Sequence, residues 1–258
     1  MNLGIDGLRV LVTAGAAGIG LETVRAFVRE GAKVHVCDID PDAIGALRAA
    51  DPGVTASQGD VADRPAMVRV FEEALRELGG LDVLVNNAGI AGPTGPVEAI
   101  DPEEWDRCLD VCITGQFNCI RLAVPHLRQS RNASIVNLSS AAGRFGFPRR
   151  TAYAAAKWAV VGFTKSLSRE LGEDGIRVNA ILPGIVAGDR QRRVLEVKAQ
   201  QLGVSFAEIE RSALANASLK EYVTADQVAD QIVFLCSPRA RTISGQAISV
   251  DGDLQTLS

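Results

Sequence analysis

Short apolar segments alternate with longer amphipathic segments along almost the whole chain. The apolar segments are rich in Val and Ile and mostly continuous, which is typical of strands buried on both faces of a parallel sheet. These expected strands cover residues 9–14, 33–38, 54–59, 81–86, 134–139, 176–182 and 246–251. Helical periodicity predicts helices at 21–30, 64–78, 102–129, 152–171 and 225–236. Repeated strand–helix units predict an α/β fold, a Rossmann-like doubly wound parallel sheet of about seven strands with helices on both faces.

One long polar segment, residues 188–220, interrupts this alternation just after the sixth expected strand. No linker, low-complexity tract or repeat divides the rest of the chain, so we expect residues 1–258 to form a single domain. Ligands of open α/β sheets bind beyond the carboxyl ends of the strands. A helix-prone segment at that point is placed to form a substrate lid over 188–220. The alternative is a surface insertion without a role in binding.

The bulk composition narrows the class of protein. Apolar residues make up 47% of the 258 residues, which is enough for a substantial core. The formal net charge of −4 argues against nucleic acid as the main partner, because phosphate binding favours a basic surface. The sequence has no apolar run long enough to span a membrane, and its first residues lack the pattern of a secretory signal. We therefore expect a soluble, cytoplasmic protein.

The five cysteines form no CxxC pair, so reduced thiols are expected. Cys108, Cys112 and Cys119 share one stripe of an expected helix, at steps of four and seven residues. A metal site there is one interpretation, but the chain has only two histidines and neither is nearby in sequence. A packed helix face is favoured, because free cysteine behaves as a small apolar residue. No bound metal is predicted.

A glycine-rich turn follows the first expected strand. Gly15, Gly18 and Gly20 stand between that strand and the first helix with the spacing G-x-x-G-x-G. Glycine permits a tight turn and a close approach of backbone to a ligand, and a helix N-terminus offers free N–H groups to a pyrophosphate. A plain turn would also explain the glycines, so the motif needs support from its surroundings.

Asp38 supplies that support. It ends the second expected strand, eighteen residues past Gly20, where a carboxylate can accept hydrogen bonds from an adenine-ribose diol. The same carboxylate would repel a 2′-phosphate, and no Arg or Lys lies in 14–19 to neutralise that phosphate. The pattern favours NAD over NADP. The alternative role for Asp38 is to cap the helix that follows.

Tyr153 and Lys157 stand four residues apart in an expected helix and so share one of its faces. A fixed ammonium favours the phenolate and lowers the pKa of a nearby tyrosine, which suits it to acid/base chemistry. Ser140 lies thirteen residues upstream of Tyr153, at the end of the fifth strand, and alternation along the strand turns its neighbour Ser139 away. The alternative is a solvated Tyr–Lys surface pair.

Taken in order, these motifs resemble the short-chain dehydrogenase/reductase family in its single-domain branch, over residues 6–252. The resemblance rests on "TAGAAGIG" at 13–20, "GDV" at 59–61, "NNAG" at 86–89, Ser140 with Tyr153 and Lys157, Pro183-Gly184, and "ISGQAISVDG" at 243–252. It implies that Ser140, Tyr153 and Lys157 are catalytic. The cofactor contacts it implies are Gly15, Ala17, Gly18, Ile19, Gly20, Asp38, Ile39, Asp60, Val61, Asn87, Ala88, Gly89, Tyr153, Lys157, Pro183, Gly184 and Val186.

The resemblance also implies an activity. Tyr153 would exchange a proton with the substrate oxygen while hydride passes between carbon and nicotinamide, Ser140 would hold that oxygen, and Lys157 would bind the nicotinamide ribose. We therefore expect an NAD-dependent oxidoreductase that interconverts a secondary alcohol and a ketone. The alternatives are a 3-oxoacyl thioester reductase, which usually draws on NADPH, and a dinucleotide sensor without catalysis. Family members are commonly homotetramers or dimers joined through helices such as 102–129 and 152–171, where the cysteine stripe would suit an interface.

The chain departs from the family pattern at three positions. Ala14 replaces the first glycine of the turn, and Gly188 stands where a cofactor-contacting Thr is frequent. Cys112 occupies the place of an Asn that is thought to kink its helix and hold a water leading to the catalytic Lys. Because a thiol is a poor donor and acceptor, we expect an active enzyme with a slowed proton relay. Asn118 faces elsewhere on the helix and cannot substitute.

Arginines cluster around the predicted active site. Their fork of donors matches carboxylate and phosphate, so they indicate an anionic substrate. The alternative is that they are solvated charges paired with Glu196 or Glu173. Trp158 is expected in the core. The arginines concerned are Arg144, Arg149, Arg150, Arg190, Arg192 and Arg193.

Overall fold

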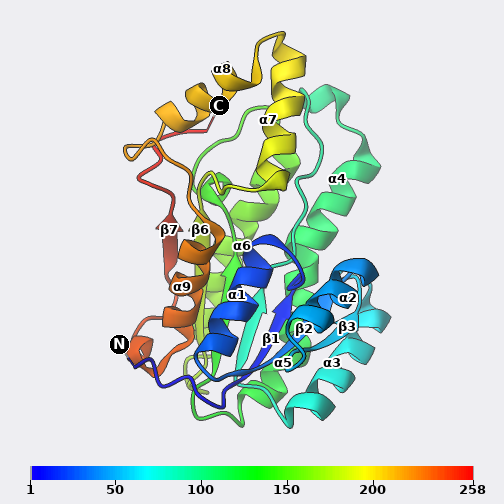
Figure 1. Cartoon of the computed structure of the whole chain (residues 1–258), viewed down its shortest axis with the longest axis vertical. Helices are drawn as coiled ribbons and strands as arrows, with labels where there is room; N and C mark the ends of the chain where they lie inside the picture. Colours follow the sequence, from blue (N-terminus) through cyan, green and yellow to red (C-terminus); the bar gives the residue numbers. More distant parts are fainter. Residues whose placement is uncertain (1, 258) are drawn as a thin grey trace.

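The structure of the protein is a computed structural model, and it describes residues 2–257. Within them seven parallel strands form one sheet in the order β3-β2-β1-β4-β5-β6-β7. The strands are β1 (Arg9–Thr13), β2 (Lys33–Asp38), β3 (Thr55–Gln58), β4 (Val83–Asn86), β5 (Ser134–Leu138), β6 (Arg177–Pro183) and β7 (Ala247–Val250). The predicted Rossmann-like doubly wound sheet is confirmed, and Figure 1 shows it with its helices.

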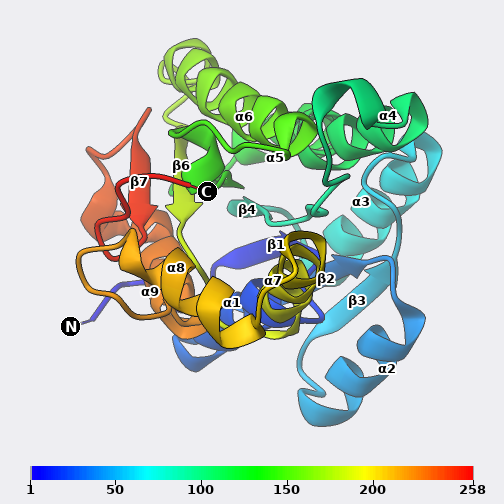
Figure 2. The same cartoon turned by 90° about the horizontal axis from the view of Figure 1, so that it is seen from above.

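Helices cover both faces of the sheet, as Figure 2 shows from above. On one face lie α1 (Gly18–Arg29), α2 (Pro41–Ala50) and α9 (Ala225–Cys236). On the other lie α3 (Arg64–Leu78), α5 (Gly115–Leu127) and α6 (Thr151–Glu170), with α4 (Pro102–Leu109) beside α6. Two further helices, α7 (Asp189–Leu202) and α8 (Phe206–Ala215), follow β6 and project beyond the carboxyl ends of the strands.

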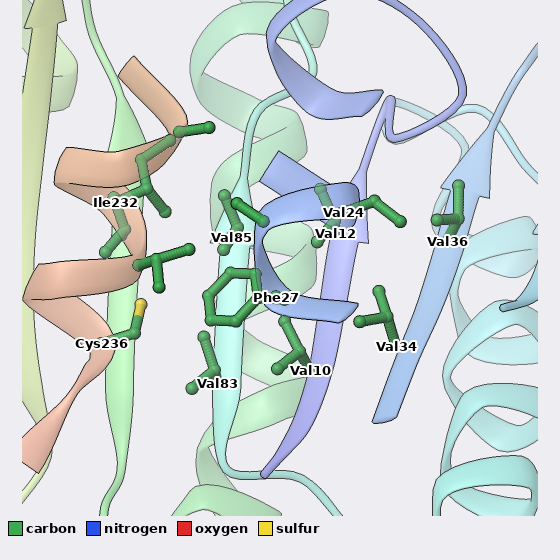
Figure 3. Packing of buried hydrophobic residues seen from close by; sticks show 14 of the residues in the cluster. Val10, Val12, Val24, Phe27, Val34, Val36, Val83, Val85, Ile232 and Cys236 are labelled. Atoms are coloured by element: carbon green, nitrogen blue, oxygen red, sulfur yellow. The ribbon is translucent and has the colours of Figure 1, made fainter. Parts of the chain in front are cut away.

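The period-2 alternation of the strands divides the core into two layers. Val10 and Val12 of β1 point to the layer that holds Phe27 and Ile232 from α1 and α9, as Figure 3 shows. Leu11, between the two valines, points to the opposite layer with α3 and α5. Because the central strands β1, β4, β5 and β6 are buried on both sides, the sheet is held rigidly between the two layers.

Helix α2 was not among the predicted helices, and its sequence explains why it forms. Asp40 is its N-cap, since the carboxylate accepts from the backbone N–H groups of Asp42 at 2.9 Å and Ala43 at 3.2 Å, and Pro41 occupies the first turn. The capping role that we considered for Asp38 belongs to Asp40.

The predicted helix 102–129 contains a π-helical turn, η2 (Asp110–Thr114), between α4 and α5. Cys112 lies inside this turn, so the backbone departs from α-helix there without an Asn. Cys108, Cys112 and Cys119 are at most 1% exposed within the chain. The expectation that their stripe forms an oligomer interface is wrong, because α6 and the sheet already cover it. The packed helix face is correct.

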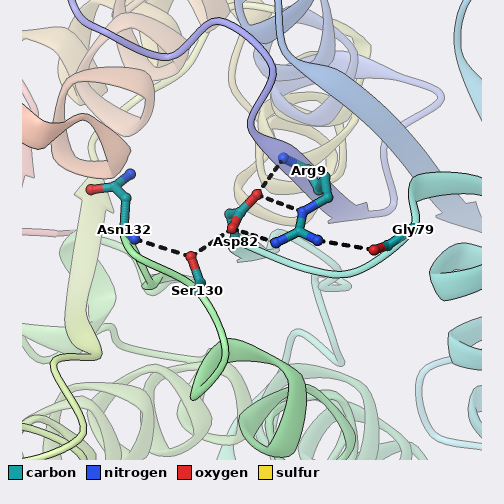
Figure 4. A network of polar contacts seen from close by, with 5 residues as sticks. All are labelled: Arg9, Gly79, Asp82, Ser130 and Asn132. Carbon is teal, nitrogen blue, oxygen red and sulfur yellow. Dashed lines mark hydrogen bonds and ion pairs between the residues drawn. The ribbon is translucent and has the colours of Figure 1, made fainter.

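A polar network joins two strands at the amino-terminal edge of the sheet. Asp82, just before β4, accepts from Arg9 Nε at 2.8 Å, Arg9 Nη2 at 2.8 Å, the Arg9 backbone N–H at 2.9 Å and Ser130 Oγ at 2.6 Å. Arg9 also donates to the carbonyl of Gly79 at 2.9 Å, and Ser130 accepts from Asn132 N–H (Figure 4). Burial alone would raise the pKa of Asp82, but the hydrogen bonds from Arg9 and Ser130 outweigh it and lower that pKa.

Among the described residues, the helices are all too short or too polar to cross a bilayer.

Candidate active site

A cavity of about 540 Å³ opens at the carboxyl-terminal edge of the sheet. Its floor comes from the loops after β1, β4, β5 and β6, and its roof from α7 and the chain segment before residue 258. Figure 2 shows α7 and α8 standing over this edge. The loops lie side by side because parallel strands all end at one edge, which is where open α/β sheets bind ligands.

The glycine turn forms one end of the cavity. Gly18 has a left-handed φ of +54° and lines the opening, while a Cβ on Gly20 would collide with the Ala14 carbonyl. Ala17 is the N-cap of α1 and has no side-chain acceptor, so the first-turn amides are left to bind an anion. These features fit a dinucleotide pyrophosphate.

Ala14 itself has a φ of +49°, in the left-handed region that glycine adopts without strain. Here the replacement of the family's first glycine carries a backbone cost. Asn87 offsets it by donating Nδ2–H to the carbonyls of Thr13 at 3.1 Å and Ala14 at 2.9 Å. Thr13 Oγ1 in turn accepts from the N–H groups of Asn87 and Ala88 at 3.0 and 3.1 Å. The turn is therefore fixed from the β4 side.

Asp38 lies at the same end of the cavity, at the tip of β2. It is 8% exposed, and its carboxylate accepts from the N–H groups of Ala16 at 3.0 Å and Asp40 at 3.2 Å. Those two bonds fix the carboxylate beside the glycine turn, where it lines the cavity. The arrangement fits an acceptor for ribose hydroxyls.

Ser140, Tyr153 and Lys157 meet at the other end of the cavity. Ser140 begins a 3₁₀ turn, η3 (Ala141–Gly143), and its Oγ accepts from Ala142 N–H at 3.1 Å, so its own O–H can still donate. Lys157 is 3% exposed; its Nζ donates to the Leu138 carbonyl at 2.7 Å and lies 5.6 Å from the centre of the Tyr153 ring. Ser139 Oγ donates instead to the Lys157 carbonyl at 2.7 Å, as the alternation predicted.

The comparisons with known proteins agree with this geometry. A family model described as "Enoyl-(Acyl carrier protein) reductase" matches residues 14–254. The 3-oxoacyl-[acyl-carrier-protein] reductase FabG of Thermotoga maritima is 35% identical over 97% of this chain and 98% of its own. The chain belongs to the short-chain dehydrogenase/reductase family. It is therefore an NAD(P)-dependent oxidoreductase acting on CH–OH groups.

Other relatives have different substrates in their names. The probable galactose dehydrogenase GalD of Rhizobium meliloti is 37% identical over 94% of this chain and 93% of its own. A crystal structure of NAD⁺-bound xylitol dehydrogenase superposes with a TM-score of 0.91 at 26% identity, covering 96% of this chain and 99% of that one. Family membership thus gives the reaction class and leaves the substrate to the residues of the pocket.

Most of the cofactor contacts predicted from the resemblance to the dehydrogenase/reductase family line the cavity. Those that do are Ala17, Gly18, Ile19, Asp38, Asn87, Gly89, Tyr153, Lys157, Pro183, Gly184 and Val186. The others are not among its lining residues: Gly15, Gly20, Ile39, Asp60, Val61 and Ala88. Of these, Asp60 has other partners: its carboxylate accepts from Arg107 Nη2 at 2.6 Å and from Ala62 N–H at 3.0 Å. All remain predicted contacts.

The thiol that replaces the family Asn lies in the wall behind Lys157. Cys112 Sγ is 3.5 Å from the carbonyl of Ile90, within reach of a weak S–H bond. A Cβ on Gly89 would lie 3.4 Å from Lys157 Nζ and 3.7 Å from Cys112 Sγ, so Gly89 stands between the two groups. Asn118 bonds instead to the Val61 carbonyl at 2.9 Å and to Arg64 Nε at 3.2 Å, on the far side of the helix as expected.

The arginine cluster divides in two. Arg150 and Arg193 line the cavity, whereas Arg144 and Arg149 are exposed and lie outside its lining. Arg192 pairs with Glu196 at 2.9 Å on the surface of α7, the solvated alternative that we considered. The side chain of Arg190 lies outside the described part of the chain.

Several lining residues were missed by the sequence analysis. They are Lys198 on α7, Asn216 after α8, and Thr256 and Leu257 near the C-terminus. The last two reach the pocket because Leu254 bridges to Ala217, which brings the end of the chain over η3. Burial lowers the pKa of Lys198. No spacing rule connects these positions with Tyr153.

Within residues 2–257 no three His, Cys, Asp or Glu side chains gather as a metal site. The five thiols are all buried and unpaired by disulfide.

Proposed function

We propose that the protein is an NAD-dependent dehydrogenase that interconverts a secondary alcohol and a ketone. One observation carries the proposal: Ser140, Tyr153 and Lys157 line the same cavity as the glycine turn and Asp38. A dinucleotide anchored at the turn would therefore reach the acid/base group. NAD, when bound, supplies the hydride acceptor for the alcohol carbon.

In this proposal Tyr153 takes the hydroxyl proton of the alcohol. The Lys157 ammonium, 5.6 Å from the Tyr153 ring centre, favours the phenolate that accepts it. Ser140 donates its O–H to the substrate oxygen and so fixes the oxygen opposite the phenol. Lys157 is itself held by the Leu138 carbonyl, which fixes the ammonium in the cavity wall, where it would bind the ribose hydroxyls of the cofactor. In the reducing direction the same proton returns to the ketone oxygen.

Asp38 supports NAD as the preferred cofactor. Its carboxylate is fixed by two backbone N–H groups and would accept from both ribose hydroxyls, while repelling a 2′-phosphate. The xylitol dehydrogenase with the same fold was crystallised with NAD⁺. Replacing Asp38 with Ser should shift the ratio of kcat/KM for NAD over NADP towards NADP.

Helices α7 and α8 support the proposed substrate lid at 188–220. Residues 188, 189, 191, 193–195, 198, 213 and 216 all line the cavity, so the segment forms a large part of its roof. Gly188, with a φ of +140° that glycine adopts readily, begins the segment and is the hinge of the proposed lid. A closing lid would exclude water from the hydride-transfer site.

A 3-oxoacyl thioester reductase is the second candidate. The Thermotoga relative carries that name and aligns with nearly the whole chain. Asp38 argues against it because the reaction usually uses NADPH. Oxidation of NADPH by acetoacetyl thioester, faster than NAD reduction by any alcohol, would favour this candidate.

The direct test is a substrate screen. Sugars, polyols, hydroxy acids and steroid-like alcohols are offered with NAD or NADP, and absorbance at the reduced-cofactor band is followed. We expect NAD reduction with at least one secondary alcohol and its loss in Tyr153→Phe. Tight NAD binding without turnover of any alcohol or of the thioester would instead identify a dinucleotide sensor.

The homo-oligomer and the cytoplasmic location stay predictions. Phe117 on α5 and Trp158 on α6 are 44% and 51% exposed, and Trp158 is therefore not the core residue that we expected. Exposed aromatic side chains on neighbouring helices support an interface between copies of the chain.

A further inference from the structure

We propose that Arg150 binds an anionic group of the substrate next to the carbon that is oxidised, so that the preferred substrates are hydroxy and keto acids. The inference rests on the proposed dehydrogenase function and names the substrate class of that same site. It starts from one unusual side chain: Arg150 is only 5% exposed, yet it lines the cavity beside the acid/base group.

Arg150 is held in place before any substrate arrives. Its Nη2 donates to the carbonyl of Ala91 at 2.6 Å, in the loop that follows β4. Its Cζ lies 5.1 Å from the centre of the Phe147 ring and 5.2 Å from that of Tyr153, so the guanidinium is bracketed by two aromatic rings. A preorganised cation loses little conformational entropy on binding an anion.

The position of Arg150 selects where on the substrate the anion must lie. The guanidinium and the Lys157 ammonium sit at similar distances from the Tyr153 ring, 5.2 and 5.6 Å. Both cations therefore lie beside the ring whose phenol exchanges a proton with the substrate oxygen, and both line the same cavity. A carboxylate one to three carbons from the carbinol carbon could reach the guanidinium while its hydroxyl meets Tyr153 and Ser140. Arginine has five N–H donors in a fork that matches a carboxylate.

The other charged residues that line the cavity also favour an anionic substrate. Lys157, Arg193 and Lys198 also line it, against the carboxylates of Asp38 and Asp189. Asp38 is occupied by backbone amides at the opposite, glycine-turn end. The substrate end therefore has a positive potential, which attracts anions and is strengthened by burial.

Arg150 could instead serve only to join the β4 loop to the start of α6. Its neighbour Arg149 provides the comparison, because the Arg149 carbonyl accepts from Gly95 N–H at 2.9 Å and so also joins that loop. The Arg149 side chain, however, is exposed and lies outside the cavity lining. Two adjacent arginines thus differ in access to the substrate.

The test uses acid–amide pairs of equal shape: 2-hydroxybutanoate, 3-hydroxybutanoate and 4-hydroxypentanoate, each with its amide. Calorimetry measures their dissociation constants for the NAD-loaded enzyme, and turnover gives kcat/KM for the same pairs. The variants are Arg150→Gln, which keeps a donor for the Ala91 carbonyl without the charge, Arg150→Lys, which keeps the charge, and Arg149→Gln as the matched control. Circular dichroism and NAD affinity check that each variant is folded.

We expect the wild type to bind at least one acid more tightly than its amide. In Arg150→Gln that preference should fall roughly 10- to 100-fold, the size of one charge-assisted contact. Arg150→Lys should retain part of the preference for the acid, and Arg149→Gln should retain all of it.

Equal binding of acids and amides by the wild type, no binding of any acid, or an unchanged preference in Arg150→Gln would each overturn the inference. If neutral alcohols are still oxidised in that case, the proposed dehydrogenase function stands. If acids bind through Arg150 but no alcohol is oxidised, the proposed function fails and the anion site stands.

Discussion

Two polar regions lie at opposite ends of the same parallel sheet, one built on the half-buried Arg9 and the other on the buried Arg150. At the amino-terminal edge, Arg9 and Asp82 satisfy one another through three hydrogen bonds, and Ser130 completes the carboxylate. At the carboxyl-terminal edge, Arg150 and Lys157 are held by backbone carbonyls and line an open cavity. Similar charged groups are thus joined to a carboxylate at one end of the sheet, where they stabilise the fold, and line the cavity at the other end.

The largest effect should come from the carboxyl-terminal edge. Tyr153→Phe removes the acid/base O–H and should lower kcat by about 10³-fold, within the range of general acid–base catalysis. Thermal stability should change little. Tyr222→Phe is the matched control: it is the chain's other tyrosine, and its hydroxyl donates to Glu210 at 2.7 Å outside the cavity lining. Equal activity of both variants would show that the phenol of Tyr153 takes no part in proton transfer.

Substitution at the amino-terminal edge should have the opposite effect, lowering stability and leaving catalysis unchanged. Asp82→Asn leaves the half-buried Arg9 without its carboxylate and should lower the free energy of unfolding by about 2 kcal/mol, less than for a fully buried pair because water reaches the guanidinium, with kcat/KM unchanged where the variant is folded. Asp174→Asn is the control, because its pair with Arg128 at 2.8 Å is exposed and should matter by less than about 1 kcal/mol. Chemical denaturation measures both.

The sign of the pH dependence follows from the lowered pKa of Asp82. Its stabilisation is present above the ordinary value of 3.8 and is lost as the pH falls through the lower, folded-state value. The wild type should therefore lose more stability than Asp82→Asn on strong acidification. Equal losses of stability in the wild type and Asp82→Asn would contradict a lowered pKa for Asp82.

The hydrogen-bonded network around His35 tests whether a second buried polar group also makes the stability of the fold depend on pH. His35 on β2 hydrogen-bonds to Thr55 Oγ1 at 2.8 Å and Ser57 Oγ at 2.9 Å, and Ser57 donates on to Glu73. Desolvation by burial lowers the pKa of His35 from 6.5 to about 4. The unfolded chain thus binds more protons between those values, and stability falls as the pH drops through them. At pH 5 the free energy of unfolding should be about 2 kcal/mol lower than at neutral pH because of His35.

Denaturation of wild type and His35→Asn at pH 5 and pH 7 checks this. The variant should lose less stability between the two values than the wild type. His126→Asn, at the chain's other histidine, should behave as the wild type does. The same pH dependence in all three proteins would contradict a buried neutral His35.

The smallest effect should come from the wall behind Lys157. Cys112→Asn restores the family residue in the π-helical turn and should raise kcat several-fold if the proton relay is slowed by the thiol. Cys108→Ser, one turn earlier in the same apolar cluster, is the control. If kcat of Cys112→Asn is no higher than that of the wild type at any pH, the thiol does not slow proton transfer.

Local sequence spacing could predict the arrangement of residues that lie on a single helix or at the end of a single strand. The four-residue step placed Tyr153 and Lys157 on one face of α6, and period-2 alternation separated Ser140 from Ser139. Asp38 could be assigned because it ends β2 after the glycine turn. Each of these predictions depends on the geometry of a single helix or strand.

What the sequence could not predict depends on contacts between distant segments. Periodicity placed three cysteines on one stripe but could not show that α6 and the sheet cover it. Thr256 and Leu257 reach the pocket only because Leu254 pairs with Ala217. Arg9 and Asp82 are 73 positions apart and meet only when β1 pairs with β4. The six arginines looked alike in sequence, and only burial separated Arg150 from Arg149.

The most direct test of hydride transfer centred on Tyr153 is isotopic. A secondary alcohol deuterated at the carbinol carbon is incubated with the NAD-loaded enzyme, and the reduced cofactor is analysed by mass spectrometry. We predict that the wild type transfers deuterium to NAD and that Tyr153→Phe, which still binds NAD, transfers almost none. A wild type that binds NAD but transfers no deuterium from any alcohol of the panel, or a Tyr153→Phe variant that transfers it as fast, would contradict the account.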